Sequence, residues 1–301
     1  MTAVGLLVPF EIHSKMGIGT REHMDGLVAM VNSRGGLDAI SEESSLGMAV
    51  SWFIAWTDTM VSIFYNTPPR FELIPSVATC EPWLTLEPLS LLGQRYEAKL
   101  VNLTRSRSQS RHLIELHHGL QDVLPLPKVI AEKLAAKGQM PQVILYKSQL
   151  ECLERRALHF SQSSLDVEPE LLVFPMFGCA ALIHILLFMR EAKASPTLCN
   201  LISARMKDVM RIVGIEKLEV KYPEMILWML VMGGLGSRGG VSHRWFVDMI
   251  AETCQRSGLK GVDEVGLTLA EFLWLAEYHG PKTKDFWEIV SVAQNEKNPP
   301  A

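Results

Sequence analysis

Apolar residues recur at three- and four-residue intervals along almost the whole chain, and strand-like alternation is nearly absent. The clearest run is made up of Leu46, Ala49, Val50, Phe53, Met60, Val61 and Phe64. It ends at Asn66-Thr-Pro-Pro, because proline cannot continue a helix. Since this spacing places apolar side chains on one face of a helix, the sequence predicts an all-α fold, a single large irregular multi-helix domain.

Domain boundaries are expected where this spacing stops. No repeat at a solenoid period is evident, so residues 1–294 are expected to form one domain and residues 295–301 a disordered tail. Two polar breaks interrupt the domain, near 102–111 and near 161–166. The first break, in which arginines stand among serines, is typical of a solvated connection.

Local signals predict where several helices of the C-terminal half begin and end. Ser195-Pro196, Pro223 and Ser242 each precede an apolar run with helical spacing. Thr268-Leu-Ala-Glu271 matches a capping box and therefore predicts a helix start. Gly280-Pro281 is the matching helix end.

The longest apolar run, from Leu171 to Met189, approaches the length of a membrane span. Pro175, Gly178 and His184 interrupt it, and charged residues lie close to both of its ends. A helix that is apolar all round lies either in a large protein core or in a membrane. We interpret the run as a buried central helix, with a membrane-associated helical protein as the alternative.

Composition indicates a folded protein without a strong attraction to nucleic acid. Hydrophobic residues make up 48% of the chain and charged residues 21%, which allows a sizeable core. The formal net charge is -4 and the pI is about 6.2, so no global field favours phosphate backbones.

The five cysteines are Cys80, Cys152, Cys179, Cys199 and Cys254. They are spread along the chain, and several lie in apolar runs, which is typical of buried free thiols. A zinc cluster requires closely spaced thiolates, and no two cysteines approach a C-x-x-C spacing. The sequence therefore contains no recognisable zinc module.

Gly234-Leu-Gly236-Ser-Arg-Gly239 fits the G-x-G-x-x-G pattern of dinucleotide-binding loops. The apolar run before it begins at Pro223 and is rich in methionine instead of β-branched residues. Only 62 residues follow Gly239, too few for the rest of a doubly wound sheet. We expect a tight turn between helices, with a nucleotide-binding enzyme that uses Gly234–Gly239 as the alternative.

His112, His117 and His118 lie near Glu115, but their spacing fits neither H-E-x-x-H nor its inverse. The G-x-S-x-G motif is absent, and no cysteine lies in a sequence typical of a nucleophile. The sequence therefore predicts no catalytic residue, no metal ligand and no cofactor-binding residue, and the chain is not expected to be an enzyme.

Three segments of the N-terminal region resemble the fungal-specific transcription factor domain, the large helical region that follows a binuclear zinc cluster in many fungal regulators. They are residues 23–40 (HMDGLVAMVNSRGGLDAI), residues 55–58 (AWTD) and residues 68–71 (PPRF). The resemblance continues through residues 179–185, 227–234, 244–246, 272–274 and 286–287. It implies that these later segments are core helices and that Gly233-Gly234 is a helix breaker.

The resemblance also implies a function, namely transcriptional regulation of fungal metabolism in the nucleus, for example of a secondary-metabolite gene cluster. Members of the family typically carry a zinc cluster before this domain, whereas this chain begins almost directly at the regulatory region. We therefore expect it to act through protein partners, either other regulators or further copies of itself, and not through direct DNA binding or a membrane. A small effector would be sought first around Cys179, His184 and Trp228.

Overall fold

The structure is a computed structural model of the chain, and it describes residues 11, 19–72, 107–123, 140–165, 169–190 and 195–297. Every regular element in these ranges is a helix, which confirms the predicted all-α fold there. In chain order they are α2 (Thr20–Asn32), α3 (Gly36–Glu43), α4 (Ser45–Tyr65), α7 (Arg107–Val123), α9 (Met140–Ser161), the 3-10 helix η2 (Pro169–Leu172), α10 (Val173–His184), the π-helix η3 (Ile185–Met189), α11 (Pro196–Val213), α12 (Ile215–Lys221), α13 (Pro223–Gly236), α14 (His243–Ser257), α15 (Val262–Ala270) and α16 (Ala276–Lys297).

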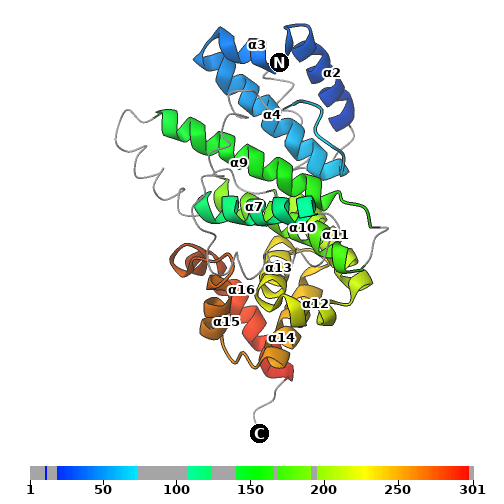
Figure 1. Cartoon of the computed structure of the whole chain (residues 1–301), viewed down its shortest axis with the longest axis vertical. Helices are drawn as coiled ribbons and strands as arrows, with labels where there is room; N and C mark the ends of the chain where they lie inside the picture. The colour runs from blue at the N-terminus through cyan, green and yellow to red at the C-terminus, as the bar shows by residue number, and fades with distance from the viewer. Residues whose placement is uncertain are drawn as a thin grey trace.

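The helices form three successive groups along the long axis of the molecule (Figure 1). Helices α2, α3 and α4 lie at one end, and α12, α13, α14, α15 and α16 lie towards the other. Between them lie α7, α9, α10 and α11. Helix α10 contacts α9, α11 and α13, so it joins the middle group to the C-terminal one.

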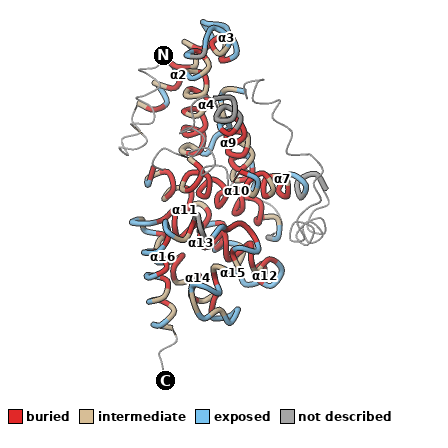
Figure 2. Tube along the Cα trace, turned by 90° about the vertical axis from the view of Figure 1, so that its left-hand side faces the viewer, coloured by how far each residue is buried: buried red, intermediate tan, exposed pale blue. Residues whose placement is uncertain are grey.

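Helices α10 and α13 are the centre of the core (Figure 2). Every residue of α10 is buried, and so is every residue of α13 from Glu224 to Gly236. Both helices are apolar on all sides, which is the composition of a helix surrounded by other helices. The predicted buried helix at Leu171–Met189 is therefore confirmed, although it is built from three pieces, η2, α10 and η3.

Two stretches of the described chain are long and apolar enough to cross a membrane, Leu46–Tyr65 and Glu170–Met189. In the structure, 61% of the apolar window of the first and 89% of that of the second are buried against the rest of the protein. A core helix of a folded domain meets the same criteria of length and composition.

The glycine pair near the N-terminus turns the chain between two helices. Helix α2 ends at Asn32, and α3 begins at Gly36. Gly35 and Gly36 have φ values of 86° and 97°, a region that side chains other than glycine rarely adopt. The predicted end of α4 at Asn66 is confirmed, since Asn66 has a φ of 56°.

The first predicted polar break is partly wrong. Residues 102–106 lie outside the described residues, but residues 107–111 belong to the first turns of α7. Arg111 is exposed and its Nε donates to Glu115 at 2.9 Å, one turn further along the same helix. Polar residues can occupy the solvent side of an amphipathic helix, so a basic run does not by itself break one. Of the second predicted break, residue 161 is still the last residue of α9, residues 162–165 lie outside any helix, and residue 166 is not described.

The predicted boundaries around α15 and α16 are wrong. Thr268 does not cap a helix but lies inside α15, where its hydroxyl donates to the carbonyl oxygen of Glu264 at 3.0 Å. Helix α16 continues through Pro281 and ends at Lys297, so residues 295–297 are helical and not a tail, and residues 298–301 are not described. Phe286 and Trp287, which follow the proline, are buried, and their burial offsets the hydrogen bond that proline cannot make.

Three other helix starts are confirmed. Ser195 caps α11, because its hydroxyl oxygen accepts a hydrogen bond from the Leu198 N–H at 3.4 Å. Pro223 is the first residue of α13, where its missing N–H has no helical partner to lose. Ser242 immediately precedes α14.

Candidate functional site

Three histidines meet a set of aromatic rings where the middle helices contact the C-terminal ones. We call this the histidine cluster, and it consists of His117, His184 and His279 with Phe188, Trp228, Phe272 and Trp274. The rings form a continuous series. Its ring-centroid distances are 4.4 Å for His117–Phe272, 5.5 Å for Phe272–Trp228, 5.7 Å for Trp228–His184, 5.2 Å for His184–His279 and 4.3 Å for His279–Trp274.

Burial keeps all three histidines neutral at physiological pH. It lowers the pKa of His117 and that of His279 to about 4, and it lowers the pKa of His184 well below its ordinary value. His117 Nε2 donates to the Phe272 carbonyl oxygen at 3.1 Å, which only partly opposes this effect. The cluster is therefore an uncharged aromatic layer at pH 7.

His184 differs from the other two histidines. Its side chain is completely buried, and neither ring nitrogen has a hydrogen-bond partner among the described residues. The indole N–H of Trp228, which lies beside it, also has none there. A buried polar group without a partner destabilises a folded protein, so this pair lowers the stability of the core.

The structure brings together two of the three residues around which an effector would be sought first, Cys179, His184 and Trp228. The rings of His184 and Trp228 contact each other, but Cys179 has Arg205 as its charged neighbour. Burial raises the pKa of Cys179 and that of Cys199 to about 12 and that of Cys254 to about 11, so these thiols stay protonated. Cys152 is partly exposed, and Cys80 lies outside the described residues.

Gly234 and Gly236 of the G-x-G-x-x-G pattern are packing positions, whereas a Cβ atom on Gly239 would meet nothing within 4 Å. Gly234 and Gly236 lie in the last turn of α13, and the turn after it contains Gly239 with a φ of 71°. A Cβ atom on Gly234 would lie 2.6 Å from the Phe286 ring, and one on Gly236 would lie 2.7 Å from the Ser203 hydroxyl. Because protein atoms fill the space beside these glycines, a pyrophosphate has no room there, and the predicted tight turn is confirmed. Gly233 and Gly234 were expected to break the helix, and this prediction is wrong, since both lie inside α13.

The three segments of the N-terminal resemblance contact one another. Asp58 Oδ2 accepts hydrogen bonds from the backbone N–H of Arg70 at 2.7 Å and of Phe71 at 2.9 Å. The Arg70 guanidinium pairs with Asp25 of α2, and Arg155 Nη1 of α9 donates to the Phe71 carbonyl oxygen at 2.5 Å. Burial raises the pKa of Asp58, although the two N–H donors favour its charged form. Residues 68–71 therefore hold α2, α4 and α9 together.

A surface groove of about 940 Å³ adjoins the histidine cluster between α15 and α16. We call it the tryptophan groove. It is lined by Val262, Asp263, Gly266, Leu267, Ala270, Trp274, Gly280, Pro281, Lys284, Trp287, Glu288 and Ser291. The Trp274 ring stacks on His279 and contacts the Trp287 ring at 6.2 Å, so this side chain separates the groove from the buried cluster.

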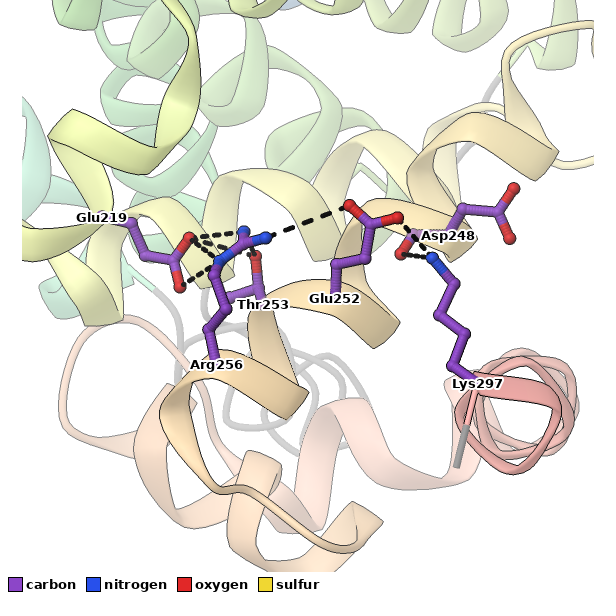
Figure 3. A network of polar contacts seen from close by, with 6 residues as sticks. All are labelled: Glu219, Asp248, Glu252, Thr253, Arg256 and Lys297. Atoms are coloured by element: carbon purple, nitrogen blue, oxygen red, sulfur yellow. Dashed lines mark hydrogen bonds and ion pairs between the residues drawn. The ribbon is translucent and has the colours of Figure 1, made fainter. Parts of the chain in front are cut away.

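Charged side chains on α12, α14 and α16 form a network of ion pairs near the C-terminus (Figure 3). Arg256 of α14 donates through Nη2 to Glu219 Oε2 of α12 at 2.7 Å. Lys297 of α16 pairs with Glu252 of α14. Glu219 is mostly buried, and its hydrogen bonds raise the pKa of Arg256. Since each charge has an opposite partner, we assign this network to helix packing.

No local sequence pattern indicated the groove or most of the histidine cluster. His117 attracted attention only for its metal-like neighbours, and His279 attracted none. Among the described residues, no three His, Cys, Asp or Glu side chains are placed to hold a metal ion. No protein-family model, no curated protein sequence and no solved structure matches this chain.

Proposed function

We propose that this chain is the regulatory domain of a transcriptional regulator of fungal metabolism, for example of a secondary-metabolite gene cluster. It acts in the nucleus by binding protein partners, and it makes no direct contact with DNA. The observation that carries the proposal is the contact between the segments that resemble the family. Residues 23–40, 55–58 and 68–71 meet through the hydrogen bonds of Asp58 and the ion pair of Arg70.

The later segments of the resemblance support the same proposal. Residues 179–185 lie in α10 and at the start of η3, residues 227–234 lie in α13, and residues 272–274 lie before α16. They contribute His184, Trp228 and Phe272 to the histidine cluster. Segments far apart in the sequence thus pack together in two places, around Asp58 and in the histidine cluster. The core helices of one regulatory domain would pack in this way.

The chemistry of the core supports binding over catalysis. The described histidines of the cluster are neutral at pH 7, and the buried thiols are protonated. Acid–base catalysis requires a pKa near the working pH, and a cysteine nucleophile requires a thiolate. The tryptophan groove, in contrast, has the size and the aromatic lining of a recognition surface.

The proposal is tested by tethering the chain to a heterologous DNA-binding module in a fungal reporter strain. We expect the tagged chain to accumulate in the nucleus and to change reporter transcription relative to the module alone. The proposal is wrong if the tagged chain is excluded from the nucleus and the reporter does not respond.

Two matched variants connect the reporter response to the fold. Asp58→Ala removes the acceptor that holds residues 70 and 71 and should weaken the response. Asp38→Ala, at an exposed position of α3, should leave it unchanged. Protein levels are measured by immunoblot, so that loss of the chain is distinguished from loss of its effect.

A further inference from the structure

The surface formed by α15 and α16 is the most apolar part of the described exterior. Five of the ten large apolar side chains that are exposed in the described chain lie between residues 262 and 292. They are Val262, Leu267, Leu275, Ile289 and Val292. Ile289 and Val292 of α16 are exposed but do not line the tryptophan groove, so the apolar surface extends beyond the groove. A small molecule in the groove would leave these two side chains in water, whereas a macromolecule would cover them.

The charges of this surface have both signs. Asp263, Lys284 and Glu288 line the groove, and none of them makes an ion pair with another residue in the part of the chain that the structure describes. The network of Glu219, Arg256 and Lys297 in Figure 3 is different, because there opposite charges are already paired within the chain. The groove thus offers one cation and two carboxylates to a partner.

We propose that the α15–α16 surface binds a second copy of this chain across a twofold axis. In a twofold interface the same patch lies on both sides, so residue i of one copy contacts residue j of the other and the reverse also holds. Such a patch must carry both charge signs around an apolar centre, as this one does. Lys284 of each copy then faces Asp263 of the other, and the exposed apolar side chains beside one groove enter the groove opposite.

This inference does not rest on the proposed function, because self-association requires only the surface itself. It can be tested with the purified chain, whereas the role in transcription is tested in cells. If the chain does not self-associate, the proposed role in transcription is unaffected, and the reverse also holds.

Analytical ultracentrifugation of the full chain over a range of concentrations is the first test. We expect the wild-type chain to form a dimer, and Leu267→Glu to weaken dimerisation at least about a hundredfold, since it buries a carboxylate in each half of the interface. Val241→Glu is the matched control. Val241 is 97% exposed, lies in the turn after α13 and should not affect the dimer.

Charge exchange is the second test, and it reports on the twofold geometry itself. Lys284→Glu alone places Glu opposite Asp263 in both contacts, and Asp263→Lys alone places Lys opposite Lys284. Each variant should self-associate about tenfold more weakly. When the two variants are mixed, both contacts again join opposite charges, so a heterodimer should form with wild-type affinity, and high salt should reduce the difference.

A monomeric wild-type chain at high concentration would overturn the proposal, and so would a dimer that Leu267→Glu leaves intact. A mixture of the two charge variants that associates no better than either alone would overturn the proposed pairing. Circular dichroism of each variant checks that it is folded, which is expected because all four altered side chains are exposed.

Discussion

Helices α13 and α15 are both short, apolar and rich in small residues, yet the protein uses them in opposite ways. Around α13, other helices cover every side, and Gly233 and Gly234 lie against the rings of Phe246 and Phe286. Around α15, only Val265 and Leu269 are buried, and a Cβ atom on Gly266 would meet nothing within 4 Å. The comparison shows that an apolar helix is not by itself a core helix. The core side is filled by the chain, whereas the α15 side is left open to a partner.

The largest expected contrast is between a core and a surface truncation. Trp228→Ala should reduce the free energy of unfolding by about 4 kcal/mol, because it removes a completely buried indole and leaves a cavity. Val262→Ala, on the α15 surface, should reduce it by less than about 1 kcal/mol. Urea unfolding followed by circular dichroism measures both. Similar losses for the two variants would contradict the division into core and open surface.

Glycine-to-alanine substitutions should change the stability in opposite directions in the same two helices. In Gly233→Ala the added methyl group would lie 2.2 Å from the Phe246 ring, so we expect about 2 kcal/mol of destabilisation. Gly266→Ala meets no atom and should stabilise the helix by about 1 kcal/mol. Thermal unfolding at low protein concentration measures the difference without a contribution from association. A stabilising Gly233→Ala would show that α13 is packed less tightly than described.

Acid should destabilise the core side specifically. In the folded chain the pKa of His117 and that of His279 are about 4, below the unfolded value of 6.5. Between these values the unfolded chain binds more protons, so stability is present above pH 6.5 and is lost as the pH falls towards 4. From pH 7 to pH 5 each of the two histidines should contribute a loss of about 2 kcal/mol.

The matching variant is His117→Gln, which cannot titrate in this range. Urea unfolding at both pH values should show a smaller loss for the variant than for the wild-type chain. An unchanged pH dependence would mean that His117 is already accessible to protons in the folded chain.

The smallest expected effect concerns His184. Neither of its ring nitrogens has a partner among the described residues, and its neighbours are Phe188, Trp228 and His279. His184→Leu removes this polar group from an apolar site and should stabilise the chain by about 1 kcal/mol at pH 7. Thermal unfolding provides the measurement. A clear destabilisation would reveal a hydrogen-bond partner for His184. It would also favour a binding role for this part of the core.

Local sequence signals predicted some elements well and others badly, for identifiable reasons. Asn66 and Pro223 mark real helix ends because their backbone preferences act within one turn. The helix start predicted at Thr268 and the helix end predicted at Pro281 were wrong, because the buried residues around them outweigh the local backbone preference. The prediction of a loop at residues 107–111 was wrong, since a basic, serine-rich stretch can have the same composition in a loop as on the solvent-exposed face of a helix.

The candidate site was less predictable than the helices. His184 and Trp228 were chosen because they lie in apolar runs, and the structure brings their rings into contact. His117, Trp274 and His279 join them from segments that no local pattern connects. Asp58 is similar, because its partners at residues 70 and 71 are found only when the chain folds back on α4.

The sequence by itself determined the all-α fold, the burial of the long apolar run and the tight turn at the second glycine motif. These properties follow from periodicity and composition, which act locally. Tertiary structure alone decided that α13 is enclosed while α15 is open, that three distant histidines are neutral in one aromatic layer, and that Asp263, Lys284 and Glu288 surround one groove. Solvent exposure and proximity depend on how helices pack, and residues far apart in the chain set both.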